Sequence, residues 1–558
     1  MDTDDAAAAG FIQPGPALAN TFDDDRVLRS HLRRVLPGEL FAVATADYSA
    51  LGEHAAEAWE SARARTPEAP RLVQWDAWGN HVDRIETTRV WQQGPALAAR
   101  FGLVAAGHEA SNGAHARVDQ FARVYLHHVA SEFFTCPLAM SDGAVAALKA
   151  SGNAALCARA LPRLLSRDPA QLWISGQWMT ETAGGSDVGR TSTVARRDGH
   201  GRWRLHGRKW FTSAVVGEMA LALARPEGAG DGADALALFL VETRDAEGRW
   251  NGIRVDRLKD KLGTRELPTA EIHLDGSLAE PVGELAHGVR QVVPMLTITR
   301  TWNAVCALAT MRRCLALALA HARGREAFGR PLALQPLHRA TLAALQAEFE
   351  AAFELVFFVV ELLGRVEHGG GEADQTLLRA LTPLAKLWTG KLAVRIASET
   401  CEAFGGAGYV EDTGIPLLLR DAQVYPIWEG TTNVLALDTL RALRGDRIGH
   451  ILHGADALLV EAGGDAHGIA AALGAARDQL DAVERSRDEI ESVARGIALT
   501  LARGFAAALL ARHARWTREH EGSARAGAAL SLFAGHGISR LRAPAMDAVA
   551  MLVDNDGP

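Results

Sequence analysis

The sequence predicts an α+β protein in which helical and β-rich regions follow one another along the chain. Six short β-rich segments separated by turn residues lie between residues 171 and 284, and long helical patterns lie on both sides of them. No G-x-G-x-x-G motif follows a predicted strand, so an alternating dinucleotide-binding fold is not expected. Because 558 residues exceed what one hydrophobic core organises, we expect four regions: an N-terminal extension and helical domain (1–170), a β domain (171–284), a helical bundle (285–450) and an extra C-terminal helical domain (451–558).

The composition excludes several classes of protein. Hydrophobic residues make up 48% and charged residues 23%, as in ordinary globular domains. The net charge of -8 argues against affinity of the whole chain for nucleic acid or membranes. Five cysteines lie far apart without a C-x-x-C pair, which predicts reduced thiols and no zinc site. The acidic start lacks a signal-peptide pattern, and the most apolar run, Phe353–Gly364, is too short to span a bilayer. We therefore expect a cytoplasmic protein.

Each region has its own pattern. From about Tyr48 to Arg163, Ala- and Leu-rich windows carry charged residues at helical spacing and predict helices. In the β region, Trp203-Arg204-Leu205-His206 alternates with period two, and Gly- and Asp-rich turns separate the segments, which predicts an antiparallel sandwich or barrel. After Gly288, two helical stretches each exceed thirty residues, as in an antiparallel bundle. A change of composition at His453–Gly468 precedes the last helices.

Two motifs of the β region suit a flat, anionic ligand. In WMTETAGGSDVG, Thr180 and Ser186 flank a glycine pair, and such loops offer backbone N–H groups to anions. A plain hairpin loop explains the same residues. In GRKWFTSAVVGE, Trp210 can stack on a planar ring and Thr212 can donate to it. A tryptophan of the barrel core is the simpler interpretation of that motif when it is taken alone.

Two further motifs end long helices. RGREAFG contains Arg325 and Phe328, and the arginine suits either a phosphate or a solvated helix C-terminus. ETCEAFGGAGYVED contains Gly405, Gly406 and Gly408. One glycine suffices to end a helix, so three indicate close contact with a ligand or with another backbone.

The stretch PIWEGTTNVLALDTL places one carboxylate, Glu429, between an indole and a glycine at the start of a predicted helix. Glu429 is therefore either a residue of a helix start or a base. Trp428 beside it can remove water from the carboxylate and so raise its affinity for a proton.

Together, in this order and across this layout, the five motifs resemble those of the acyl-CoA dehydrogenase flavoprotein family, over roughly Pro137 to Arg444. The segments FIQPGPALANTFDDDRVL and WDAWGNHVDRIETTRVW resemble the start of its AidB branch, the alkylation-response flavoproteins, which carries an extra C-terminal helical domain.

The resemblance implies an FAD-dependent dehydrogenation of an acyl-CoA. Glu429 would be the catalytic base that takes the α-proton, and its backbone N–H would hold the thioester oxygen. The residues implied to contact FAD within one chain are Thr180, Ser186, Trp210, Thr212, Thr431 and Asn433. Arg325, Phe328, Gly405 and Gly406 would grip the ADP half of FAD in a neighbouring subunit. A shared cofactor implies a homotetramer built as a dimer of dimers.

Some positions depart from the family pattern. Thr299 stands where one branch of the family carries its base, which leaves Glu429 as the candidate. Glu402 replaces a usual glutamine near the ADP half, and Glu266 and Leu267 replace small residues near the substrate mouth.

Two other functions stay open. The segment from Arg495 to Arg542 contains eight arginines but only two glutamates. This excess of positive charge suits nonspecific DNA binding or a solvated helix face. A protein that binds acyl-CoA without turnover, as a sensor, would carry the same motifs.

Overall fold

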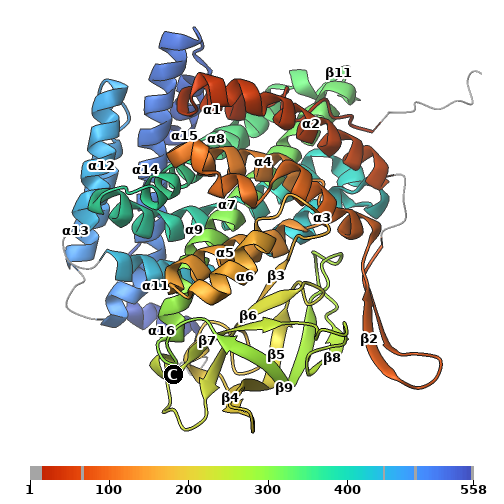
Figure 1. Ribbon diagram of the computed structural model, residues 1–558. Helices are drawn as coiled ribbons and strands as arrows, with labels where there is room; N and C mark the ends of the chain where they lie inside the picture. The colour runs from red at the N-terminus through yellow and green to blue at the C-terminus, as the bar shows by residue number, and fades with distance from the viewer. Residues whose placement is uncertain (1–14, 64–67, 444–446, 483–486, 554–558) are drawn as a thin grey trace, which may run out of the picture.

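The computed structural model describes residues 15–63, 68–443, 447–482 and 487–553. Helices form the larger part of the molecule, and the β domain lies at one end of it, against helices α5 and α6 (Figure 1). The order of the regions along the chain is helices, sheet, long helices and further helices, so the predicted α+β class is confirmed.

The N-terminal region contains six helices and one hairpin that the helical pattern did not predict. The helices are α1 (Arg26–Val35), α2 (Gly38–Arg63), α3 (Arg89–Phe101), α4 (Ala116–His128), α5 (Thr135–Ser151) and α6 (Ala154–Leu164). The hairpin is formed by β1 (Arg71–Trp75) and β2 (His81–Glu86), so the prediction of helices throughout this stretch was wrong here. The physical reason is the turn, where Asp76 Oδ1 accepts hydrogen bonds from the N–H groups of Trp78 and Asn80 at 2.8 Å.

The β domain is a sheet that closes on itself. Its strands are β3 (Ser175–Trp178), β4 (Val194–Arg197), β5 (Trp203–Thr212), β6 (Met219–Pro226), β7 (Ala237–Glu242), β8 (Ile253–Leu258) and β9 (Ala270–Pro281). The order β3-β6-β4-β5-β9-β7, with β6 also paired to β7, makes a barrel, and β8 pairs with β9. β8 was not among the six predicted strands. The pairs β3–β6 and β4–β6 are parallel, so the antiparallel expectation was wrong for them. Residue patterns give a strand's faces but not its partner.

Three long helices follow: α7 (Gly288–Gly324), α8 (Pro336–Glu367) and α9 (Glu372–Ala403), of 37, 32 and 32 residues. A short hairpin joins α7 to α8; its strands, β10 (Glu326–Ala327) and β11 (Arg330–Pro331), have two residues each. The remaining helices are α10 (Ile415–Ala422), α11 (Thr432–Ala442), α12 (Arg447–Ala462), α13 (Ile469–Ala482), α14 (Arg487–His520), α15 (Arg525–Gly535) and α16 (Met546–Val553). α12 runs through the predicted boundary at residue 451, and the division into domains stays a prediction.

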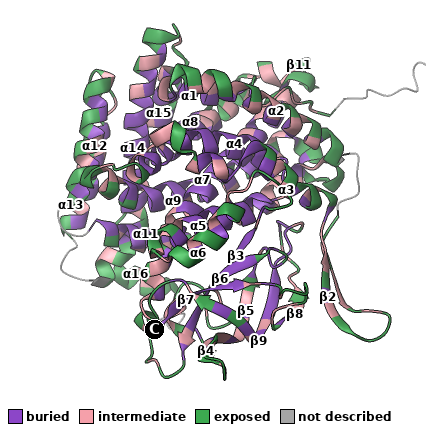
Figure 2. Cartoon of the chain, in the orientation of Figure 1, coloured by how far each residue is buried: buried purple, intermediate pink, exposed green. Residues whose placement is uncertain are grey.

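The described residues form two large hydrophobic cores and one small cluster around Trp59, Leu317 and Phe404. The larger is shared by the N-terminal helices, α7–α9 and the C-terminal helices, where buried residues concentrate in α4, α7 and α9 (Figure 2). The smaller fills the barrel around Trp178, Phe239 and Ile272. α7 and α14 are long and apolar enough to span a membrane, but 78% and 83% of their most apolar windows are buried inside the protein, as in core helices.

Candidate active site

Glu429 lies in the short loop between α10 and α11, in an unusual backbone conformation. Its φ is 57° and that of the next residue, Gly430, is 105°. Thr431 then caps α11, because its side chain accepts a hydrogen bond from the N–H of Val434 at 3.5 Å. A left-handed conformation costs a residue with a side chain about 1–2 kcal/mol, so contacts from elsewhere in the fold must hold Glu429 in place.

The Glu429 carboxylate is half-buried and is held by α7. The Thr299 hydroxyl donates a hydrogen bond of 2.7 Å to its Oε2. Thr299, which cannot act as a base itself, therefore orients the carboxylate that can.

Two basic side chains hold the main chain at Glu429 and at the residue after it. Arg300 Nε donates to the Glu429 carbonyl oxygen at 3.2 Å, and Lys386 Nζ donates to the Gly430 carbonyl oxygen at 2.6 Å. Asp438, on α11, fixes the arginine through a bond of 2.7 Å and accepts a second bond of 2.7 Å from Arg379. Although burial opposes it, the bond from Arg379 and the charge of Arg300 hold the pKa of Asp438 below its ordinary value.

The backbone N–H of Glu429 donates to no acceptor in the part of the chain that the structure describes. A carboxylate and an N–H donor of the same residue are thus both available at one point. This arrangement suits proton abstraction next to a carbonyl group, because one group takes the proton while the other stabilises the developing oxyanion.

The surroundings of Glu429 come from three further segments. Trp428 packs edge-on against Phe133, with ring centroids 6.2 Å apart. Cys136 of α5 lies near enough for its ionisation to respond to Glu429 and Lys261, and burial raises the pKa of this thiol to about 12. Burial lowers the pKa of Lys261 to about 8, and its ammonium donates to the Leu267 carbonyl oxygen at 2.6 Å.

The segment that departs from the family pattern reaches this area. The N–H of Thr264 donates to Asp421 Oδ1 at 2.6 Å. Burial, and then the charge of Glu266, raise the pKa of Asp421 to about 7. Leu267 is buried. An effect of Glu266 and Leu267 on the substrate mouth stays a prediction.

Thr180 and Trp210, predicted to contact the flavin, are neighbours. The N–H of Trp210 donates to the Thr180 carbonyl oxygen at 2.9 Å. Trp210 is half-buried, unlike the fully buried Trp178 of the barrel core, and Lys259 Nζ lies 3.6 Å from its ring centroid. The core interpretation of Trp210 therefore does not hold. The Thr180 hydroxyl makes no hydrogen bond within the described residues.

The other predicted flavin contacts differ in availability. Thr212 is buried, and its hydroxyl donates to the Ala270 carbonyl oxygen at 2.7 Å, so it cannot donate to a ligand at the same time. Ser186 lies exposed on its loop, and Asn433 is exposed in the first turn of α11.

The residues predicted to serve a neighbouring subunit gather at the far end of α7. His321 stacks on Phe404, with ring centroids 4.2 Å apart, which brings the ends of α7 and α9 together. Phe328 is 98% exposed, with a φ of 52°. Gly405 and Gly406 are exposed, with open space where a side chain would stand. Arg325 ends α7 and is exposed, 26 positions after Thr299. At 1.5 Å per residue that is about 39 Å along the helix.

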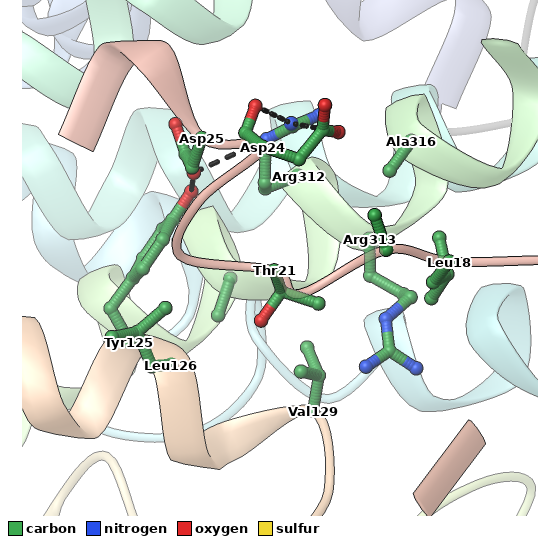
Figure 3. A pocket seen from close by; sticks show the side chains of 12 residues that line it. Leu18, Thr21, Asp24, Asp25, Tyr125, Leu126, Val129, Arg312, Arg313 and Ala316 are labelled. Carbon is green, nitrogen blue, oxygen red and sulfur yellow. Dashed lines mark hydrogen bonds and ion pairs between the residues drawn. The ribbon is translucent and has the colours of Figure 1, made fainter. Parts of the chain in front are cut away.

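Two cavities lie apart from these residues. A small one of about 30 Å³ lies beside α4 and α7, where Tyr125 and Arg312 both bind Asp25 (Figure 3). A larger one of about 300 Å³ lies between α1, α8, α14 and α15. Neither is lined by a residue predicted to bind FAD or acyl-CoA, whereas Arg525 of the predicted arginine band lines the larger one.

Half of the arginines in the predicted band form ion pairs within the described residues. Arg503 is buried and binds Glu348 at 2.6 Å. Three more arginines of the band form ion pairs with carboxylates: Arg512, Arg515 and Arg525. Half of the band is therefore neutralised within the fold, and DNA binding stays a prediction.

The motifs did not reveal the role of several residues of the site. Lys386, Arg379 and Asp438 were not singled out, and Thr299 was noted only as a residue that is not a base. Thr299, Arg379 and Lys386 lie in the interiors of helices outside the five motifs, and Asp438 lies in α11 within the quoted stretch PIWEGTTNVLALDTL. A lysine within the apolar run ALTPLAKLW is the one signal that the sequence offers.

Comparison with known proteins gives the family. Residues 13–169 match the "Adaptive response protein AidB N-terminal domain", residues 176–277 the "Acyl-CoA dehydrogenase, middle domain" and residues 286–443 the "Acyl-CoA dehydrogenase, C-terminal domain".

Two relatives and one solved structure extend this match. The chain is 41% identical over 533 residues to acyl-CoA dehydrogenase family member 11 of Caenorhabditis elegans, which covers 91% of this chain and 86% of that protein. It is 33% identical over 399 residues to AidB of Escherichia coli (strain K12), a match that covers 70% of this chain and 72% of that protein. The crystal structure of Caenorhabditis elegans ACDH-11 in complex with C11-CoA matches with a TM-score of 0.90 and 38% identity, over 98% of this chain and 97% of that chain. The protein therefore belongs to the acyl-CoA dehydrogenase family, in its AidB-like branch.

Proposed function

We propose that the protein is an FAD-dependent acyl-CoA dehydrogenase that removes the α-proton and a β-hydride from a fatty acyl-CoA, with Glu429 as the base. The observation that carries the proposal is the loop itself. It combines an oriented carboxylate, an unengaged N–H of the same residue and two cations on its main chain.

The chemistry requires this combination. The α C–H of a thioester is a weak acid, so its proton moves only to a positioned base while the forming enolate oxygen is stabilised. In the proposed step the proton passes to the Glu429 carboxylate, and the electron pair of the C–H bond moves into the enolate. The N–H of Glu429 then holds the enolate oxygen.

The residues of the β domain fit a flavin. Trp210 offers a half-buried ring face and the Thr180 hydroxyl is not engaged within the described chain, as a planar heterocycle with polar edges requires. Asn433 offers an exposed amide beside the base, and Ser186 an exposed hydroxyl for the pyrophosphate region. The Thr431 oxygen already accepts the cap bond from Val434, so its O–H would donate to the cofactor, whereas Thr212 already donates to Ala270 and would act as an acceptor. FAD, when bound, accepts the β-hydride.

The assembly follows from the length of α7. Arg325 lies about 39 Å along the helix from the residue that binds the base, which places it too far away to serve the same cofactor. Large apolar side chains are exposed around this end: Phe328 at 98%, Leu337 at 82% and Tyr409 at 92%. Exposed apolar groups gathered in this way mark interfaces. We therefore propose a homotetramer, a dimer of dimers, in which this end completes the ADP site of a partner subunit.

The cellular setting is proposed with the activity: a cytoplasmic enzyme of fatty acid metabolism. ACDH-11, whose structure holds C11-CoA, supports a fatty acyl-CoA as the ligand. The rival that keeps the same site is a binder that holds acyl-CoA without turnover. The DNA-associated rival has less support, because its arginines are partly paired.

The experiment is an anaerobic titration of the purified flavoprotein with acyl-CoAs of increasing chain length, followed by the visible flavin absorbance. Loss of the flavin band with one class of chain supports the dehydrogenase. Binding of acyl-CoA with an unchanged band would favour the binder. A protein that retains no flavin would contradict the cofactor site. DNA binding that falls steeply with salt would support the other rival.

A further inference from the structure

Lys386 is a buried cation directly beneath the loop of the base. Its side chain is fully buried in the middle of α9, yet no carboxylate lies within ion-pair distance of it in the part of the chain that the structure describes. Among the described residues, the Lys386 ammonium donates one hydrogen bond, to the Gly430 carbonyl oxygen at 2.6 Å. A buried ammonium without a carboxylate in ion-pair contact is costly, and such groups concentrate at functional sites.

The other charges around Lys386 are already engaged. Arg300 of α7 opposes its charge and is bound to Asp438 of α11, which also binds Arg379. The remaining negative group is the Glu429 carboxylate, which favours the ammonium form of Lys386. Burial nevertheless lowers the pKa of Lys386 to about 7.

We propose that Lys386 is a positioning residue for proton abstraction, which holds the Gly430 carbonyl and places a positive charge beside the Glu429 carboxylate. The bond to Gly430 supports the left-handed backbone that presents both the carboxylate and the N–H of Glu429. The charge has the sign that attracts the carboxylate and, later in the step, the enolate. This inference rests on the proposed role of Glu429 as the base.

The charge stays useful throughout the step. When the α-proton passes to Glu429, the carboxylate becomes neutral and the negative charge moves to the enolate oxygen at the N–H of the same residue. Because the negative charge moves only within this loop, the ammonium continues to balance it.

The test measures exchange of the α-hydrogens of 3,3-dimethylbutanoyl-CoA with D₂O, catalysed by the holoenzyme. This thioester has α-hydrogens but no β-hydrogen, so exchange reports the base alone. The variants are Lys386→Met, which removes bond and charge, and Lys386→Gln, which keeps a neutral donor. Lys391→Met, at an exposed position of the same helix, is the matched control, and Glu429→Gln is the reference for loss of the base.

We expect exchange by Lys386→Met at saturating thioester to fall about 10- to 100-fold, with binding of the thioester changed less than about 2-fold. The acidic limb of the pH profile should move to higher pH, because a nearby cation is lost. Lys386→Gln should recover most of the rate at high pH and keep the moved limb. Lys391→Met should behave as the wild type.

Three outcomes would overturn a claim. Wild-type exchange and an unmoved profile in Lys386→Met would refute the positioning role and leave the base in place. If Lys386→Met does not fold, an unmoved profile in Lys386→Gln would refute it equally. Wild-type exchange by Glu429→Gln would instead refute the proposed function.

Discussion

Replacing Glu429 with glutamine should stop proton abstraction while leaving the site intact. Glutamine has the same shape, and its amide oxygen can accept the 2.7 Å bond from Thr299. The bonds of Arg300 and Lys386 go to main-chain oxygens, so they do not depend on the side chain. Thermal stability and FAD content should therefore stay near those of the wild type, and what is lost is the basicity.

The size of the loss follows from that geometry. A positioned general base contributes about 10²- to 10⁴-fold to a rate, which corresponds to about 3–5 kcal/mol of activation free energy. Stopped-flow bleaching of the flavin by a saturating acyl-CoA measures this rate. Glu411→Gln, an equally isosteric change at an exposed position, should leave it unchanged. Flavin reduction by Glu429→Gln at the wild-type rate would show that another group takes the proton.

Three further predictions concern the assembly, the fold and its pH dependence. Arg325→Ala should lower FAD content and dissociate the assembly, whereas Arg323→Ala at the same exposed helix end should do neither. Flavin absorbance per protein measures FAD content and light scattering measures the assembly. Full retention of FAD and of the assembly by Arg325→Ala would contradict the shared site. Asp142→Ala should lower the free energy of unfolding by about 3–5 kcal/mol, because this buried carboxylate accepts hydrogen bonds from Arg117, Gln120 and Trp302. Chemical denaturation at neutral pH measures this, with the exposed Asp275→Ala as control. Equal stability of the two variants would refute the prediction. Burial by itself would raise the pKa of Glu181, but Lys209 and nearby hydroxyls outweigh it and lower that pKa to about 2. The stabilisation by ionised Glu181 is therefore complete above the unfolded pKa of about 4.3 and is lost as pH falls through about 2. Glu181→Gln should flatten the fall of thermal stability at acid pH. An unchanged fall in this variant would show that Glu181 is not the carboxylate responsible.

Much of the fold could be predicted because the relevant signals are local. The thirty-residue helices α7 and α8 follow from an uninterrupted helical pattern, and the position of the barrel follows from short alternating segments between turns. Local signals failed where the outcome depended on a partner. β1 and β2 form a hairpin because of the Asp76 turn, and β6 pairs in parallel with β3 and β4.

The candidate site divides in the same way. The motifs alone singled out Glu429 and the glycines at Gly405 and Gly406, because a carboxylate beside an indole and three glycines at a helix end are visible as residue types. Their spacing carried no information about which groups would surround the carboxylate. Packing decided that the Thr212 hydroxyl is already engaged and that Trp210 is not part of the barrel core.

The sequence by itself singled out Glu429 as the candidate base and showed which family the chain resembles. Only the tertiary structure decided what holds that group in place: Thr299 on its carboxylate, and Arg300 and Lys386 on its main chain. These residues come from helices that lie far from the loop in the chain. A strained loop and a buried cation are stable only together, through contacts formed when α7, α9 and α11 pack, and no local pattern of residues encodes those contacts.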